Sequence, residues 1–424
     1  MRFFRQSTYI ERLIIYFLLA ALFSRVVLEF VFGMWWYKST QPKLIFLLLL
    51  IVIDHGIWFV RGGMARIASD ARSTALLLFF GTITLHGVLV GAAWGEGPIA
   101  LADDSFPLVF LLVTVLRAAN EPQPDMQRMF DRLLWLSAGA ILLSMVVGMA
   151  GLARGLPTKA APDIIALAIY TALFFAMLAT ETRRQVILRH VLLFLPVLIF
   201  SIEDLNRTTM AFLALGALIA VALRFRIDQS GAVMALVLIG MAPLSLPFVL
   251  VEGSKTHARI ATMFDPELRE SSVSLQSREI EAQNIARALR HDGPEAQRFG
   301  LGHGATYEFR IFYQFEAEHT HAHYATALFN LRYGAVGKIY VTIIGAILLY
   351  TALLCLPSNS AMVIFFGMLS ITSFVYLFTY ANFFNFLFGL PLVGMLNTFR
   401  KPNTGQTGLP TGTLASRYKA NAAS

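Results

Sequence analysis

The sequence predicts an all-α polytopic membrane protein with about twelve transmembrane helices and one large polar loop that contains short helices. Of its 424 residues, 57% are hydrophobic and only 14% are charged, which is more apolar surface than a soluble chain of this length could bury. The apolar residues also gather into runs that can each cross a hydrocarbon core of ~30 Å. Lipid is therefore the expected solvent for most of the chain.

The first apolar run, 13–36, is too long for the core of a signal peptide, and no small-residue cleavage site follows it. It is expected to be a retained membrane helix. The other runs expected to span the membrane are 43–62, 73–94, 98–118, 133–153, 163–181, 186–203, 208–225, 231–251, 336–356, 361–380 and 383–398. The chain then divides into transmembrane helices (1–252), a large loop (253–335), further transmembrane helices (336–398) and a tail (399–424) whose composition is typical of disorder.

The basic residues predict the orientation of these helices. The formal net charge is +8, and arginine is the commoner basic residue. When the helices alternate across the membrane, one face collects most of the basic residues, namely Arg2, Arg5, Arg61, Arg66, Arg72, Arg117, Arg128, Arg132, Arg183, Arg184, Arg189, Arg224, Arg226, Arg400 and Lys401. The positive-inside rule makes that face cytoplasmic, so both termini are expected in the cytoplasm and the large loop outside it. Such a charge suits membrane lipids and phosphate groups, whereas nucleic acid is not an expected partner.

Ionisable residues inside the apolar runs are few, and a structural role is expected for them. Arg25 and Glu29 have the i,i+4 spacing that lets them neutralise each other, and Asp54 and His86 could pair between neighbouring helices. The single cysteine, Cys355, lies in an apolar run, which excludes a disulfide framework.

Arg207 is the first candidate site residue, because it stands where one predicted helix leaves the membrane and the next, 208–225, returns. An arginine at the lip of an apolar helix needs an anion or a carboxylate nearby. Glu203 and Asp204 could supply that carboxylate, and a bound anionic ligand is the alternative.

Arg278 is the second candidate, and it lies on a helix predicted over 274–290 within the large loop. An apolar stripe at helical spacing marks the packed face of this helix, formed by Leu275, Ala282, Ile285 and Leu289. Arg278 falls on that stripe. It therefore needs a buried or ligand-derived partner, unless its side chain simply extends to the surface.

A glycine-rich turn and a histidine cluster close the loop. Gly300 and Gly302 permit positive φ and a close backbone approach, but without a strand–helix context they are a weak phosphate-binding signal. Three histidines alternate beside two glutamates just before the apolar run 324–333, namely Glu316, Glu318, His319, His321 and His323. At the N-terminus of a helix, His323 would be kept neutral by the helix dipole, as a general base requires. The same cluster could instead bind a metal ion.

Four short motifs, in order, resemble the O-antigen ligase and polymerase family, whose members have two arginines, a glycine-rich turn and a histidine motif at these places. In this chain the motifs read Asn206-Arg207-Thr-Thr-Met-Ala, Ser277-Arg278-Glu-Ile-Glu, Gly300-Leu-Gly302 and His321-Ala-His323-Tyr324, followed by Gly334 and Gly337. The resemblance covers roughly residues 201–337. The family usually has asparagine or serine after the histidine, where this chain has Tyr324, so His321 stays a candidate beside His323.

The resemblance implies a GT-C-like glycosyltransferase of the Gram-negative inner membrane, with its active site at the periplasmic face. The implied donor is a glycan on undecaprenyl diphosphate, and the implied acceptor of the ligase branch is lipid A-core oligosaccharide. A polysaccharide polymerase of the same family is one alternative. A transporter of lipid-linked glycans is an alternative from another class.

The resemblance also assigns roles. His323 would be the catalytic base, and Arg207 and Arg278 would stabilise the diphosphate, whose charge grows as the glycosidic bond breaks. Neither a metal nor another cofactor is expected. The further residues expected to contact substrate are His321, Tyr324, Gly300 and Gly302.

Overall fold

The fold is seen in a computed structural model that describes residues 8–34, 40–60, 71–118, 125–156, 158–159, 161–203, 207–226, 229, 273–309, 318–320, 322, 324–377 and 389–399. Almost all of them are helical. The helices are Tyr9–Leu22 (α2), Thr40–Val60 (α3), Ala71–Ala93 (α4), Pro98–Ala118 (α5), Met126–Ala153 (α6), Ile164–Thr180 (α7), Arg184–Glu203 (α8), Arg207–Phe225 (α9), Val273–His291 (α14), Pro294–Phe299 (α15), Ala325–Cys355 (α16), Ala361–Leu377 (α17) and Gly389–Thr398 (α19). Helix α2 continues as a π-helix, Phe23–Val31 (η1), and the strands Tyr307–Phe309 (β1) and Glu318–Thr320 (β2) pair antiparallel.

The described helices confirm an all-α membrane protein. Five of them are long and apolar enough to cross a bilayer: α2 with η1, α4, α5, α6 and α16. Shorter apolar helices cover Ile45–Val60, Ile164–Thr180, Leu213–Phe225 and Ala361–Leu377. Every predicted apolar run overlaps a described helix except 231–251, which lies outside the described residues.

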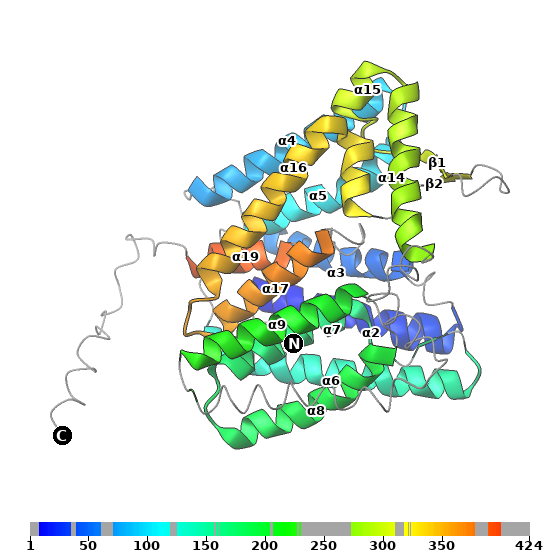
Figure 1. The fold of residues 1–424 in the computed structure, drawn as a ribbon. Coiled ribbons are helices and arrows are strands. Elements are labelled where there is room, and N and C mark those ends of the chain that lie inside the picture. Colours follow the sequence, from blue (N-terminus) through cyan, green and yellow to red (C-terminus); the bar gives the residue numbers. More distant parts are fainter. Residues whose placement is uncertain are drawn as a thin grey trace.

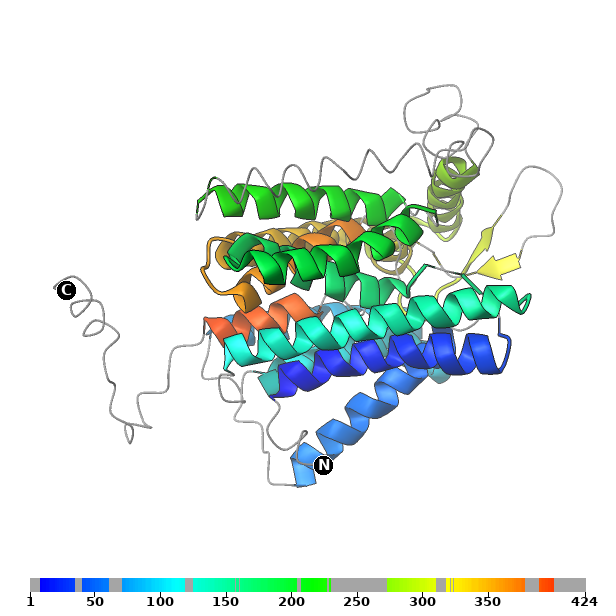
Figure 2. The same ribbon diagram turned by 90° about the horizontal axis from the view of Figure 1, so that it is seen from below.

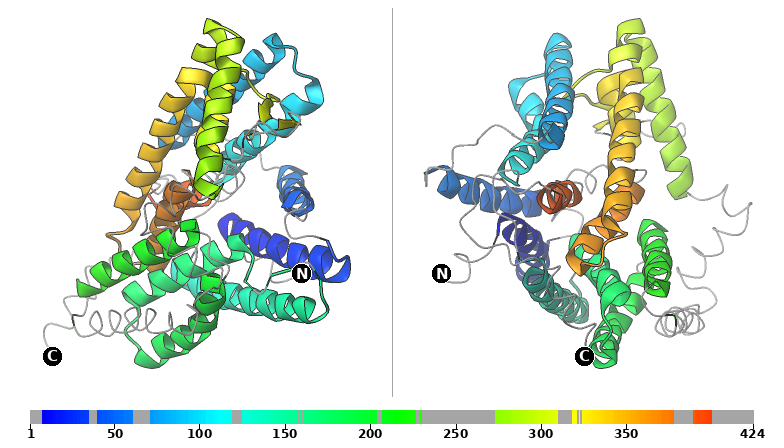
Figure 3. Two further views of the ribbon diagram at one scale, coloured as in Figure 1. Left: turned by 45° about the vertical axis from the view of Figure 1, so that its right-hand side comes forward. Right: turned by 90° about the vertical axis from the view of Figure 1, so that its left-hand side faces the viewer.

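The helices form two groups that meet at α17 and α19 (Figures 1 and 2). Helices α2, α6, α7, α8 and α9 pack together in the first group, and α4, α5, α14, α15 and α16 make up the second. Helix α17 contacts α6, α7 and α9 on one side and α16 on the other, while α19 contacts α2, α5 and α16. Figure 3 shows the second group extending away from the first beyond this junction.

Helix α7 lies at the centre of the first group. Every residue from 165 to 179 is buried, which explains why its sequence is apolar on all sides. Asp163 begins the helix by accepting a hydrogen bond from the Ile165 amide at 2.9 Å. Polar caps of the same kind begin α2, where Thr8 bonds the Glu11 amide, and α6, where Asp125 bonds the Arg128 amide.

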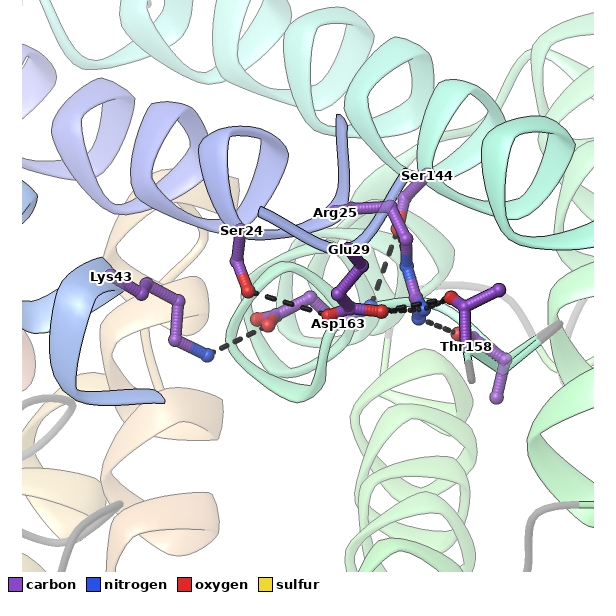
Figure 4. A network of polar contacts seen from close by, with 8 residues as sticks. Ser24, Arg25, Glu29, Lys43, Ser144, Thr158 and Asp163 are labelled. Atoms are coloured by element: carbon purple, nitrogen blue, oxygen red, sulfur yellow. Dashed lines mark hydrogen bonds and ion pairs between the residues drawn. The ribbon is translucent and has the colours of Figure 1, made fainter. Parts of the chain in front are cut away.

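A buried ion network joins η1 to the segment between α6 and α7 (Figure 4). Arg25 Nη1 lies 2.6 Å from Glu29 Oε2, so the predicted i,i+4 pair is confirmed. Thr158 donates to the same Glu29 oxygen at 2.8 Å. Lys43 Nζ and Asp163 Oδ2 form a second pair at 2.8 Å. The two positive and two negative charges of this network cancel, and a charge inside a protein is stable only when an opposite charge neutralises it.

The expected pairing of Asp54 with His86 is wrong. Asp54 on α3 instead lies 2.9 Å from Arg117 Nη1 on α5 and 3.3 Å from Arg12 Nε on α2. His86 on α4 points toward α16, where its Nδ1 lies 3.0 Å from the hydroxyl of Tyr340. An arginine neutralises a buried carboxylate more completely than a neutral imidazole does.

Candidate functional site

The helix predicted over 274–290 is confirmed as α14, Val273–His291, but its packed face is turned from the expected one. Ile285 and Leu289 are buried as predicted, whereas Ala282 is exposed. The side chain of Leu275 lies outside the described residues. Glu281 takes the buried position that the apolar stripe had given to Ala282.

Glu281 is buried because a tyrosine from β1 satisfies it. The Tyr307 hydroxyl donates to Glu281 Oε1 at 3.2 Å. Burial, followed by the nearby Glu281 carboxylate, raises the pKa of Tyr307, so the phenol keeps the proton that it donates. This contact fixes α14 against the hairpin that leads toward the histidine motif.

Arg278 lies one turn before Glu281 and meets the histidine motif. Its guanidinium carbon is 4.9 Å from the ring centroid of Tyr324, a cation–π contact between two motifs that are distant in sequence. The Arg278 side chain is partly buried. Its Nε atom is buried and has no hydrogen-bond partner among the residues that the structure describes. A guanidinium N–H in that position is a ready donor for an oxyanion.

Tyr324 is also the residue that caps α16, since the helix begins at Ala325. In the sequence, His323 is the residue before this N-cap. His321 and His323 themselves lie outside the described residues. Their roles as base and substrate contact stay predictions.

Arg207 is the first residue of α9, and Glu203 is the last of α8. The two apolar helices thus end and begin where the sequence predicts. Asp204 and the side chains of Arg207 and Glu203 lie outside the described part of the chain. The choice between a carboxylate and a ligand as the partner of Arg207 stays a prediction.

The glycine-rich turn is docked tightly between two helices. Gly300 and Gly302 both have φ of +79°, and a Cβ on Gly302 would lie 1.9 Å from the amide nitrogen of Gly91 on α4. A Cβ on Gly300 would lie 2.3 Å from the carbonyl carbon of Arg332 on α16. The amides of Leu301 and Gly302 donate to carbonyls of α16, each at 2.9 Å. Close packing alone accounts for the two glycines, and their contact with substrate stays a prediction.

A buried polar cluster follows the turn, and the sequence analysis missed it. His303 is completely buried, with Nδ1 2.7 Å from the Ser105 hydroxyl and Nε2 2.8 Å from the Tyr333 hydroxyl. Beside it, Asp104 on α5 forms an ion pair with Arg332 on α16 and accepts the Gly304 amide at 2.7 Å. Burial, helped by the Arg332 charge, lowers the pKa of His303 from 6.5 to about 4. The imidazole is therefore neutral at physiological pH.

One signal could have revealed this cluster. Arg332 interrupts the apolar run 324–333, and a charge in such a run requires a buried partner. Asp104 lies within another apolar run, 98–118, and has the opposite charge. His303 carried no such signal, because a histidine between glycines is typical of an exposed turn.

The two glycines that follow the histidine motif bend α16. Gly334 has φ +57° and ψ −137°, which only glycine adopts readily, and it divides the helix into two arms. Figure 1 shows the arms meeting at a sharp angle. A Cβ on Gly334 would lie 2.6 Å from the Gln297 carbonyl oxygen, and one on Gly337 would lie 2.1 Å from that of Phe329. The bend therefore makes room for the end of α15.

Within the described residues, no group of three or more His, Cys, Asp and Glu side chains could hold a metal ion. Of the proposed cluster, Glu318 and His319 are described only as backbone in β2, and the other members lie outside the described residues. The metal alternative at that cluster stays open.

No model of a known protein family matches this chain, and no curated protein matches it. The family resemblance therefore rests on the four sequence motifs alone.

Proposed function

We propose that the protein is an O-antigen ligase, a metal-independent glycosyltransferase of the Gram-negative inner membrane. It transfers a glycan from undecaprenyl diphosphate to lipid A-core oligosaccharide at the periplasmic face. The observation that carries the proposal is the contact of Arg278 with Tyr324, the last residue of the histidine motif, by an arginine whose buried Nε has no hydrogen-bond partner among the described residues. A cation and a base at one place are the two groups that this reaction needs.

The proposed reaction is a single displacement. The acceptor sugar hydroxyl attacks the anomeric carbon of the donor and gives its proton to His323. The bond between that carbon and the diphosphate oxygen breaks, undecaprenyl diphosphate leaves, and the configuration at the carbon inverts. Arg207 and Arg278 bind the diphosphate oxygens as their negative charge grows, so the two arginines stabilise the transition state more than the bound donor.

Arginine suits this role better than lysine. Its planar fork of N–H groups matches two phosphate oxygens at once, and it stays charged next to an aromatic ring. The ring of Tyr324 holds one face of the Arg278 guanidinium, so the donors at its edge can point toward an anion. This arrangement supports a diphosphate-binding role for Arg278.

The test uses the purified chain with lipid-linked glycan and lipid A-core in the presence of a chelator. The wild type is expected to form the ligated product, and His323→Ala to abolish it. Arg278→Ala should lower kcat about 100-fold or more. Arg278→Lys should have a kcat between those of the wild type and Arg278→Ala, since lysine keeps the positive charge but lacks the paired N–H donors of the guanidinium. Arg290→Ala is the matched control, because Arg290 is an exposed residue of the same helix.

Several results would contradict the proposal. Undiminished ligation by Arg278→Ala or His323→Ala would remove the assigned roles. Loss of product in chelator would favour the metal alternative. A lipid-linked glycan that lengthens without lipid A-core would identify a polymerase. Binding of the lipid-linked glycan without any new glycosidic bond would favour a transporter.

A further inference from the structure

The first arm of α16, residues 325–333, carries the histidine motif at one end and the bend at the other. The inference drawn from it rests on the proposed function. At the motif end, Tyr324 contacts Arg278. At the bend, the last two residues of the arm are each held by a polar partner, Arg332 by Asp104 and Tyr333 by the buried His303. We call Asp104, His303, Arg332 and Tyr333 the anchor.

The hydrogen bonds around His303 determine which nitrogen carries its proton. Ser105 lies on α5, and its hydroxyl donates to the Leu101 carbonyl at 2.6 Å, so it has no proton left for the imidazole. His303 Nδ1–H therefore donates to Ser105 at 2.7 Å, and Nε2 accepts from the Tyr333 hydroxyl at 2.8 Å. Only a neutral imidazole can make both bonds. Tyr333 is thereby tied to α5.

Backbone hydrogen bonds also join the residues of the anchor to their neighbours. The His303 amide donates to the Gly87 carbonyl of α4 at 2.8 Å, and the Arg332 carbonyl accepts from the Gly302 amide at 2.9 Å. The charged or titratable groups facing His303 are Asp104 from α5, His86 from α4, and Arg332 and Tyr333 from α16. None of these groups is among the residues assigned to the diphosphate or to the catalytic base, so the anchor is proposed to act through the arm.

We infer that His303, acting through Tyr333, is a positioning residue that fixes the direction of the first arm of α16, and with it the histidine motif joined to the start of that arm. The arm is about 13 Å long, so a tilt of about 5° at Tyr333 moves its far end by about 1 Å. A misplacement of about that size can cost as much as 100-fold in rate. The anchor thus controls the position of the histidine motif, including the Tyr324 ring that contacts Arg278. Because the arginines are proposed to act mainly in the transition state, kcat should depend on the anchor more than donor binding does.

The test compares Tyr333→Phe with Tyr340→Phe. Each change removes one phenol from α16 that bonds a histidine, but Tyr340 bonds His86 and lies beyond the bend. Tyr333→Phe is expected to lower kcat about 10- to 100-fold while the KM for the lipid-linked donor changes less than about twofold. Tyr340→Phe should leave both constants within about twofold of the wild type.

A second measurement needs no substrate. Hydrogen–deuterium exchange of the amides in 325–333 should be faster in Tyr333→Phe than in Tyr340→Phe when both are compared at the same distance below their unfolding temperatures. Equal exchange in the two variants, or a fall in kcat shared by both, would overturn the anchor. If the wild type makes no ligated product but the exchange differs as expected, the proposed function fails and the anchor stands.

Discussion

Several buried carboxylates among the described residues are neutralised by a cation, which lies on the same helix in one case and on a different helix in others. Glu29 and Asp163 are matched by Arg25 and Lys43 inside one network. Arg278 differs, because among the described residues its contact is an aromatic ring. A guanidinium held in this way keeps its hydrogen-bond donors for another anion.

Glu29→Gln should destabilise the protein strongly, by about 3–5 kcal/mol, because it leaves Arg25 buried without a full counter-charge. The unfolding temperature in detergent is the measurement. Glu181→Gln is the control, since the arginine that pairs with Glu181 is Arg183, whose side chain is exposed and can be solvated without its partner. A loss of stability in Glu181→Gln as large as that in Glu29→Gln would show that burial of the ion pair is not the cause.

The free energy of unfolding should depend on pH, because the fold requires His303 to be neutral. The pKa of His303 is lowered to about 4 in the folded protein, mainly by burial, from 6.5 in an unfolded chain, so acid favours the unfolded state. The contribution of neutral His303 to this free energy is complete above pH 6.5 and is lost as the pH falls toward about 4. Between about pH 7.5 and about pH 5 the loss is ~2 kcal/mol.

Comparison with His303→Asn isolates this effect from other titrating groups. The difference in unfolding temperature between wild type and variant should shrink as the pH falls over that range. A difference that stays constant with pH would mean that His303 is not held neutral by the fold.

For individual residues, the sequence predicted those contacts that depend on spacing along one helix. The Arg25–Glu29 pair follows from their separation of one helical turn. The partners of Asp54 and His303 did not follow, because they come from elements that are distant in the sequence and brought together only by packing.

The bend of α16 is the element on which the candidate site depends. The apolar runs 324–333 and 336–356 were predicted as separate segments, and the structure joins them as the two arms of α16, Ala325–Cys355. The first run was predicted to stop at Gly334, where the break is, but a bend within one continuous helix was not predicted, because a single glycine is common in transmembrane helices. Its positive φ is imposed by the packing of α15 against α16.

Gly334→Ala should therefore straighten or destabilise α16. The φ of +57° costs an alanine about 1–3 kcal/mol, and its Cβ would also meet the carbonyl of Gln297. The expected results are a lower unfolding temperature and loss of ligation. Gly81→Ala is the control, because a Cβ at this helical glycine has no atom within 4 Å, and it should be neutral or slightly stabilising. A Gly334→Ala variant as stable and active as Gly81→Ala would contradict the proposed bend.

For the molecule as a whole, hydropathy predicted which segments are helices but not how they assemble. All of the spans present similar apolar surfaces, so nothing in their sequences says that α17 and α19 join two groups. The polar loop was predicted as a separate segment, whereas α14 and the glycine-rich turn pack against α16 and α4. Fixed glycines and buried charges, rather than hydrophobicity, specify those contacts.

The predicted orientation can be tested with single cysteines. Cys355 is buried and can first be replaced by serine. Arg290→Cys, on exposed α14, should then react with a membrane-impermeant maleimide in intact spheroplasts. Arg183→Cys, equally exposed, should react only after the membrane is opened. The reverse pattern would put the large loop in the cytoplasm and remove the periplasmic site.

Because the glycine-rich turn packs on α4, the residues that are tolerated at positions 87 and 91 depend on the residue at position 303. A Cβ at Gly87 would lie 2.2 Å from His303 Nε2, and a Cβ at Gly91 would lie 2.4 Å from the His303 carbonyl oxygen. A lineage that keeps this histidine must keep both glycines, while one that loses the histidine side chain frees position 87 to diversify. Divergence at these sites should therefore proceed in one order, with the imidazole lost before the glycine.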